Sequence, residues 1–247
     1  MLGTYINAAA IILGGIIGFL LIKPLNANQQ NFLKTGLAVF TIFFGLRLLW
    51  ESVNGTFFQI LGQLGIVTLA LMAGSITGRL LRLQHTSNRL GQYARERMIA
   101  ARPDSPNRLN DGFNVCALLY CFAPLAWLGS VHDGLSNYFY PLAVKAVMDG
   151  LATMSFVKMF GWGAMLSALP VFALQGCITV ACATYALPFL ENHHTLMEHN
   201  LVNSVNATGA ILIVCVGFLI LEIKKVPVTD YLPSLLFAPL FTWLLVR

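Results

Sequence analysis

Residues 4–22 read TYINAAAIILGGIIGFLLI and contain no charged side chain. A helix of that length rises about 28 Å at about 1.5 Å per residue, close to the roughly 30 Å hydrocarbon thickness of a bilayer. We therefore expect this run to cross a membrane as a helix. No basic segment precedes it, so we expect a permanent span and not a cleaved signal peptide.

The composition of the whole chain indicates the same class of protein. Of the 247 residues, 57% are hydrophobic and 10% are charged, whereas soluble domains have about 45–50% apolar and about 25% charged residues. A soluble fold of this size could not bury so much apolar surface. An ordinary cytosolic enzyme, a disordered chain and a disulfide scaffold are excluded, and the five cysteines are expected to pack as small hydrophobic side chains.

Eight segments are long and apolar enough to form spans, since each span needs about 20 mostly apolar residues. The sequence therefore predicts an all-α, polytopic membrane helical bundle that forms one transmembrane domain over residues 1–247. The fifth and sixth segments are parted only by Gly161-Trp162-Gly163, and a re-entrant geometry stays open for them. The predicted spans are 4–22, 32–50, 57–81, 113–131, 139–160, 162–188, 204–222 and 230–246.

The charges predict the orientation of these spans. With an external N-terminus, twelve of the fifteen Lys and Arg residues fall in cytoplasmic loops. The external loops hold Glu51, then His132 and Asp133, then residues 191–199, with no Lys or Arg among them. This is the positive-inside pattern, so we expect eight spans with both termini external. The same loops account for the net charge of +5, and we expect no nucleic-acid partner.

Residues 82–112 form a long, basic cytoplasmic loop that contains six arginines. Its first part, residues 83–101, is predicted to form an amphipathic helix on an anionic membrane surface. The loop either senses lipid or docks a partner, or it serves only as a basic linker that sets the topology.

An internal repeat is suggested by a shift of 173 residues, which places Thr35-Gly36 on Thr208-Gly209. Spans one to three then match spans six to eight. Because the displacement is five spans, the two copies would have opposite orientations. Inverted repeats around a site near the middle of the membrane are typical of secondary transporters.

Lys145 and Asp149 are the most costly residues of the fifth span. Their i, i+4 spacing places them on one helical face, and Asp149 lies about 15 Å from the outer end of the span. Charges near the middle of a bilayer are rare and are functional candidates. We expect Asp149 to bind a cation or a proton with Lys145 as counter-charge or anion ligand, with a structural salt bridge as the alternative. Lys145 could also extend outward to water.

Three amide side chains lie within other spans. Asn7 in the first span either offers its amide to a substrate or an ion, or bonds across helices. Gln63 in the third span and Gln175 in the sixth span either bond between helices or line a path.

A cluster of Asn203, Ser204, Asn206, Thr208 and Gly209 lies at the predicted outer start of the seventh span. Side chains of this kind cap helices. A broken helix whose N-terminus faces a cavity would also attract anionic groups. Helix capping is the simpler interpretation of the cluster, and a binding role is the alternative.

Pro124 and Pro170 lie within spans and Pro188 lies near the end of one. Proline removes a backbone donor and frees carbonyl oxygens, which produces a kink or supplies ligands for an ion.

His193, His194 and His199 lie near Glu191 and Glu198 in an external loop. This set could hold zinc or sense pH, but its spacing fits a single helical face poorly, so we expect no metal site. The motifs GxSxG, HExxH, GxGxxG and the P-loop are absent from the sequence. We therefore expect neither a catalytic residue nor a cofactor.

Three sets of motifs follow one another: Gly3-Thr4-x-x-Asn7-Ala8 with Gly14-Gly15-x-x-Gly18; Lys145-x-x-x-Asp149-Gly150; and Thr208-Gly209 to Gly217, Ile223-Lys224-Lys225-Val226-Pro227-Val228 and Leu232-Pro233. In this order they resemble a bacterial integral-membrane family, domain of unknown function 554, over nearly the whole chain. Thr208 stands where the family usually has glycine, and Asp230 where it usually has asparagine. The resemblance implies a transporter-like protein of the bacterial inner membrane, and it names no substrate.

The sequence thus predicts a secondary transporter of a small polar solute or ion, coupled to protons or cations through Asp149. The alternatives are an ion channel and a non-transporting scaffold or sensor. The predicted binding residues are Asp149, Lys145, Asn7, Asn206, Thr208, Gly209, Gln63 and Gln175. The expected partners are the lipid bilayer, the solute and a second copy of the chain in a homodimer.

Overall fold

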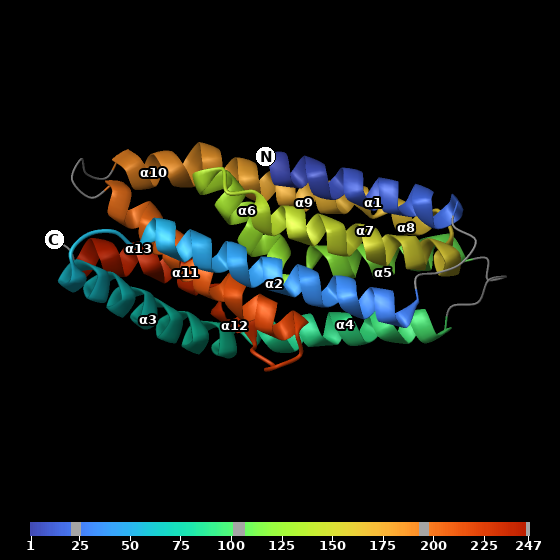
Figure 1. Ribbon diagram of the computed structural model, residues 1–247, viewed down its shortest axis with the longest axis horizontal. Helices are drawn as coiled ribbons and strands as arrows, with labels where there is room; N and C mark the ends of the chain where they lie inside the picture. The colour runs from blue at the N-terminus through green and yellow to red at the C-terminus, as the bar shows by residue number, and fades with distance from the viewer. Residues whose placement is uncertain (21–25, 101–106, 193–197, 246–247) are drawn as a thin grey trace.

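The computed structural model is built of helices and describes residues 1–20, 26–100, 107–192 and 198–245 (Figure 1). The helices in chain order are α1 (Leu2–Leu20), α2 (Ala27–Ser52), α3 (Phe57–Leu80), α4 (Leu83–Ala100), α5 (Arg108–Cys121), α6 (Pro124–Ser136), α7 (Tyr140–Phe160), α8 (Gly163–Leu166), α9 (Ala168–Ala181), η1 (Cys182–Ala186), α10 (Leu187–Asn192), α11 (Glu198–Ile220), α12 (Val228–Tyr231) and α13 (Ser234–Leu245).

The prediction of an all-α membrane bundle is confirmed. Within the described residues, six helical segments are long and apolar enough to cross a membrane, and a seventh is the bent pair α5–α6. The remaining predicted span is α7, a helix of 21 residues. Its Lys145, Asp149 and Lys158 make it more polar than the others.

The fourth predicted span, 113–131, is broken in the structure. Helix α5 ends at Cys121, α6 begins at Pro124, and the two axes differ by 58°. Proline favours the first turn of a helix, and the residue before it favours an extended backbone. Ala123 has that extended conformation, so α6 starts as a new helix after it.

The fifth and sixth predicted spans meet in a tight helical hairpin. Helix α7 continues to Phe160, and Gly161 turns the chain with φ +70°, a left-handed conformation that suits glycine. The segment from α8 to α10 then returns along the bundle, with the π-helical turn η1 between α9 and α10. Residues Tyr140–Phe160 therefore form one continuous helix.

Three pairs of helices lie side by side and run in opposite directions (Figure 1). Helix α1 packs against α9, α2 against α11, and α3 against α13. Helix α1 also packs along α7, and α6 contacts α1, α7, α9 and α11. The members of each antiparallel pair belong to the two halves of the sequence that the predicted repeat compares.

Glycines allow the backbones of α1 and α7 to touch. A Cβ atom on Gly14 would overlap the carbonyl group of Gly150, and one on Gly18 would overlap the backbone of Met154. Small residues permit this close approach between membrane helices. The glycine-rich face of α1 is therefore used within the chain.

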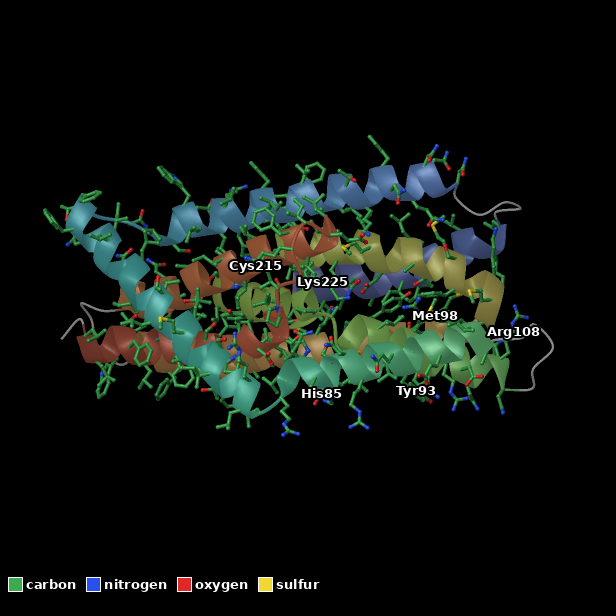
Figure 2. All side chains as sticks on the ribbon, turned by 90° about the horizontal axis from the view of Figure 1, so that it is seen from below. His85, Tyr93, Met98, Arg108, Cys215 and Lys225 are labelled. Atoms are coloured by element: carbon green, nitrogen blue, oxygen red, sulfur yellow. The ribbon has the colours of Figure 1, made fainter. Side chains whose placement is uncertain are left out.

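The predicted amphipathic helix in residues 83–101 is α4. Ala94 is fully buried and packs in a cluster with Val115 and Phe160. Figure 2 shows His85 and Tyr93 on the outer side of α4 and Met98 on the side that faces the bundle. Helix α4 is therefore docked along the bundle.

Asp230 closes the N-terminus of α4 from a distant part of the chain. Its carboxylate accepts a hydrogen bond from the backbone N–H of Gln84 at 2.8 Å. In return, the Gln84 side chain accepts a hydrogen bond from the backbone N–H of Thr229 at 3.2 Å. A carboxylate at this end of a helix satisfies a free N–H group and interacts favourably with the helix dipole. The side chain of Asp230 thus has a structural role.

Candidate functional site

Lys145 and Asp149 form an ion pair inside the bundle. They lie one turn apart on α7, and the Lys145 ammonium contacts the Asp149 carboxylate. Lys145 is 2% exposed and Asp149 is 7% exposed, so the alternative in which Lys145 extends to water is wrong. The ammonium is held inward because a carboxylate lies within reach on the same helical face.

Aromatic and hydroxyl groups of α5 and α7 surround this pair. The Lys145 ammonium lies 5.7 Å from the centre of the Tyr120 ring, a cation–π geometry. The Tyr120 hydroxyl is 2.8 Å from the Thr153 hydroxyl, which donates to the backbone carbonyl of Asp149 at 2.7 Å. Tyr120 belongs to the last turn of α5, which ends at Cys121. The ion pair therefore lies beside the break between α5 and α6.

Two predicted amides extend the site toward α1 and α9. The Asn7 amide donates to the Gln175 side-chain oxygen at 3.2 Å, and Asn7 also interacts with the Asp149 carboxyl group. Both amides are fully buried. We call Thr4, Asn7, Lys145, Asp149 and Gln175 the α1–α7 polar cluster.

The α1–α7 polar cluster contains buried polar atoms that no protein group satisfies. Within the described residues, these atoms are the Thr4 hydroxyl oxygen, the Asn7 side-chain oxygen and the Gln175 side-chain nitrogen. Buried polar atoms usually have a partner, which is either protein or ordered water, and an unpaired one costs about 1–3 kcal/mol. The cluster can therefore still bind a water molecule or a polar solute.

Two buried residues of α6 were placed wrongly by the sequence analysis. His132 and Asp133 are predicted to lie in an external loop, but α6 continues to Ser136 and buries both. Asp133 accepts a hydrogen bond from the backbone N–H of Gly3 and pairs with the amino group of Met1, both at 3.2 Å. The sequence signal was weak, because a single formal charge between two apolar runs also fits a loop.

His132 connects α6 to α11. One nitrogen of its ring lies 3.1 Å from the Asn206 side-chain oxygen, and the Asn206 amide donates to the Ser136 hydroxyl at 2.7 Å. The second ring nitrogen is buried and has no hydrogen-bond partner among the residues that the structure describes. It lies against Gly209, where a Cβ atom would overlap the ring. Gly209 thus makes room for His132.

The capping interpretation of the residues on α11 is wrong. Helix α11 begins at Glu198, so Asn203 to Gly209 lie well inside it. The apolar pattern alone located the start six residues too late, because polar residues occupy the first two turns. Thr208 bonds to the carbonyl of Ser204 on its own helix at 2.7 Å.

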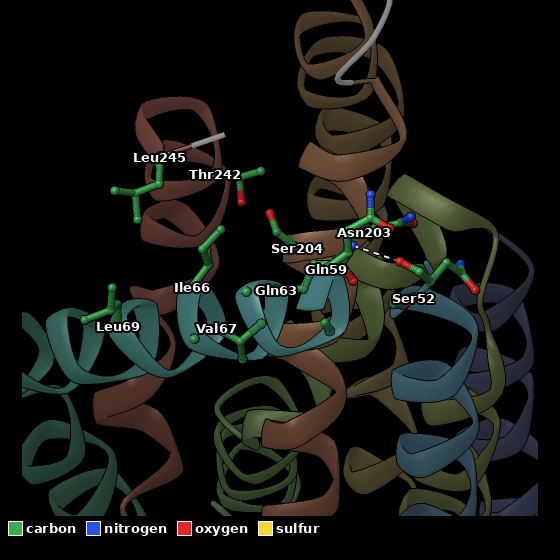
Figure 3. A pocket seen from close by; sticks show the side chains of 14 residues that line it. Ser52, Gln59, Gln63, Ile66, Val67, Leu69, Asn203, Ser204, Thr242 and Leu245 are labelled. Carbon is green, nitrogen blue, oxygen red and sulfur yellow. Dashed lines mark hydrogen bonds between the residues drawn. The ribbon is translucent and has the colours of Figure 1, made fainter. Parts of the chain in front are cut away.

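Gln63 lies apart from the other predicted site residues. It faces a pocket of about 510 Å³ between α3, α11 and α13, close to the end of α2 (Figure 3). A second pocket of about 790 Å³ is lined by apolar side chains of α6, η1, α11 and α13. Asp149 lines neither of these two pockets.

The histidine-containing loop is only partly described. His193 and His194 lie outside the described residues. Among the residues that the structure describes, no group of three His, Cys, Asp or Glu side chains could hold a metal ion. The expectation of no metal site stays a prediction.

The fold and the α1–α7 polar cluster define a class: a polytopic helical membrane protein with a buried ion pair beside a broken helix. The chain belongs to the family described as "Protein of unknown function (DUF554)", whose model matches residues 2–243. The family resemblance seen in the sequence is thereby confirmed.

Two bacterial relatives match along nearly their whole length. The chain is 28% identical over 239 residues to "Uncharacterized membrane protein YdfK" of Bacillus subtilis (strain 168), covering 97% of this chain and 94% of that protein. It is 23% identical over 240 residues to "Uncharacterized protein YqgA" of Escherichia coli (strain K12), covering 96% and 94%. No solved structure shows a significant match to the chain.

Proposed function

We propose that this protein is a secondary transporter of a small polar solute or ion, and that the α1–α7 polar cluster is its binding site. The observation that carries the proposal is the buried Lys145–Asp149 pair, which lies beside a helix break and beside polar atoms without partners. A solute would bind between the two charges and the amides of Asn7 and Gln175.

The energetics of the pair support a functional role. Removing charges from water is costly, and apolar residues of similar volume often replace a buried ion pair without loss of stability. Retaining two charges in a membrane helix is therefore better explained by what they bind than by the stability that they add. When the pair separates, Asp149 can hold a cation or a proton, and Lys145 can hold an anionic group.

The helix break supports the same site. Transporters often bind their substrate where membrane helices are discontinuous, because the helix ends present free backbone groups and partial charges. Here the C-terminal end of α5 lies near Lys145, because the ring centre of Tyr120 in its last turn is 5.7 Å from the ammonium. The partial negative charge of that end favours a cation next to it.

The arrangement of the helices supports an alternating mechanism. The three antiparallel pairs α1–α9, α2–α11 and α3–α13 are what an inverted repeat of spans one to three in spans six to eight would produce. In such a mechanism one copy of the three-span repeat moves against the other around a fixed binding site. We propose this inverted repeat together with the transport function.

The proposal places the protein in the bacterial inner membrane with both termini external, as the basic loops indicate. It includes no catalytic step and no cofactor. A homodimer is compatible with it, although the glycines on α1 are already used against α7.

The test is a flux assay with purified protein in proteoliposomes. Pyranine trapped inside reports proton movement while alkali cations, amino acids and small organic acids are added outside. We expect at least one of these solutes to drive a saturable flux in the wild type. Currents that do not saturate and that other solutes do not compete for would indicate a channel instead.

A pair of variants separates binding from folding in this assay. Asp149→Asn is compared with the double variant Lys145→Met/Asp149→Asn, which removes both charges together. We expect the double variant to reconstitute as folded protein but to transport no solute. Wild-type flux in the double variant would show that the pair is only structural and would overturn the proposal.

A further inference from the structure

The pocket between α3, α11 and α13 is separate from the α1–α7 polar cluster. It encloses about 510 Å³ and is lined at one side by Ser52 and Asn54, which lie at the end of α2. Figure 3 shows the hydroxyl groups of Ser204 and Thr242 turned toward each other across the pocket. None of the described lining residues is charged.

Three hydroxyl groups of this pocket can act only as hydrogen-bond acceptors. The hydroxyls of Ser52, Ser204 and Thr242 each donate their proton to a carbonyl of their own helix, at 2.6, 2.8 and 2.9 Å. A hydroxyl has one proton and two lone pairs, so each oxygen can then only accept. These three side chains together present acceptors to a ligand.

Gln63 adds a fourth acceptor. Its amide nitrogen donates to the backbone carbonyl of Asn54 at 3.1 Å, the dashed line in Figure 3. The Gln63 side-chain oxygen is buried and has no partner within the described residues. An amide nitrogen has two N–H groups, so the amides of Gln59, Asn203, Asn54 and Gln63 can each still donate. The three hydroxyls and the Gln63 side-chain oxygen are groups that can only accept.

The C-terminal end of α2 at this pocket favours a positive charge. Helix α2 ends here at Ser52, and the C-terminal end of a helix carries a partial negative charge. The N-terminus of α3 would oppose a cation, but Thr56 and Gln59 already close it with a capping box. A ligand with several N–H donors and a positive charge matches this environment.

We infer that this pocket binds the primary ammonium group of a small amine. An ammonium group has three N–H donors, and the oxygens of Gln63, Ser204 and Thr242 can receive them. Either a free amine or the ethanolamine headgroup of a phospholipid could supply the group. The inference does not depend on the transport proposal, because it concerns binding at equilibrium.

The test uses the full chain in nanodiscs of phosphatidylcholine and radiolabelled ethanolamine as the probe. We expect saturable binding that unlabelled ethanolamine displaces. Choline, in which three methyl groups replace the N–H donors of ethanolamine and the positive charge is kept, should displace it at least about tenfold less well, because a hydrogen bond to a charged group contributes that much. Equal displacement by choline, or no saturable binding here and no retained lipid in the headgroup test below, would overturn the inference.

Two variants assign the binding to this pocket. Gly65 lines the pocket and a Cβ atom there would meet nothing within 4 Å, so Gly65→Leu fills the space without a backbone clash. Gly36 on α2 has the same open surroundings outside the pocket, so Gly36→Leu is the matched control. We expect Gly65→Leu to abolish binding and Gly36→Leu to leave it unchanged. Thr242→Val, which removes one acceptor, should weaken binding about tenfold.

A second lipid composition identifies the source of the amine. In nanodiscs that contain phosphatidylethanolamine, a headgroup in the pocket would compete with the free probe. Native mass spectrometry would then show this lipid retained by the wild type and lost from Gly65→Leu. Unchanged probe binding with no retained lipid would assign the pocket to a free amine. Wild-type binding in Gly65→Leu would show that the amine binds elsewhere and would overturn the inference.

Discussion

At the scale of single residues, the buried charges are the feature that most needs explanation. Lys145 and Asp149 satisfy each other on one face of α7, and Tyr120 lies against the ammonium. Such a pair adds little net stability, because the cost of desolvating both charges offsets their attraction. Removing one partner is different, since it leaves an isolated charge inside the bundle.

This difference gives a prediction for stability. Asp149→Asn should lower the free energy of unfolding by about 3–5 kcal/mol, because Lys145 would remain buried without a counter-charge. The double variant Lys145→Met/Asp149→Asn should recover most of that loss. The measurement is reversible unfolding in mixed micelles with added dodecyl sulfate, and equal losses in both variants would contradict the explanation.

At this scale the sequence predicted the position of the charged pair inside a span, but it did not predict the contacts between residues that are distant in the chain. The i, i+4 spacing predicted the contact between Lys145 and Asp149, and it lies where expected. The bond from Asn7 to Gln175 joins residues 168 positions apart and could not be read from local pattern. Asp133 was misplaced because its partners come from the first residues of α1.

At the scale of helices, Asp230 connects α12 to α4, a contact that the sequence pattern does not predict. It lies on α12 and accepts a hydrogen bond from Gln84 at the start of α4. The amphipathic pattern of residues 83–101 predicted that helix, but it did not show what holds its N-terminus. The bend at Pro124 is likewise predicted only in part. Proline predicts a kink in a helix, but it does not determine the angle of 58° between α5 and α6.

The N-terminal contact of α4 gives a second prediction. Asp230→Ala should cost about 0.5–2 kcal/mol, whereas Asp230→Asn keeps an acceptor and should cost only a few tenths. Hydrogen–deuterium exchange is the measurement: the amides in the first turns of α4 should exchange faster in Asp230→Ala. Unchanged exchange there would show that other contacts, such as the packing of Ala94, hold the helix alone.

At the scale of the whole molecule, the topology of the chain is the main expectation still to be tested. Composition predicted a membrane bundle, and the structure has it. The number of spans depends on how the bent pair α5–α6 and the polar helix α7 are counted, because neither fits a simple apolar window. Local hydropathy cannot determine how such helices lie in a bilayer.

Labelling of single cysteines tests this topology. In a cysteine-free background in intact cells, a membrane-impermeant maleimide should modify a cysteine at Asn54 directly. Cysteines at Asn28 and Ser87 should react only after the cells are opened, because the positive-inside pattern places both in the cytoplasm. Reaction of all three positions in intact cells would contradict the proposed orientation.

The central claim is that the α1–α7 polar cluster opens to water and solute. The direct measurement compares Asn7→Cys with Ile11→Cys, two fully buried positions one turn apart on α1. Both variants, in proteoliposomes and without the native cysteines, are treated with a small methanethiosulfonate ammonium reagent. We predict that position 7 reacts at least about tenfold faster than position 11, because Asn7 belongs to the polar cluster whereas Ile11 packs in an apolar core. Equally slow reaction at both positions would show that the cluster stays closed and would contradict the account.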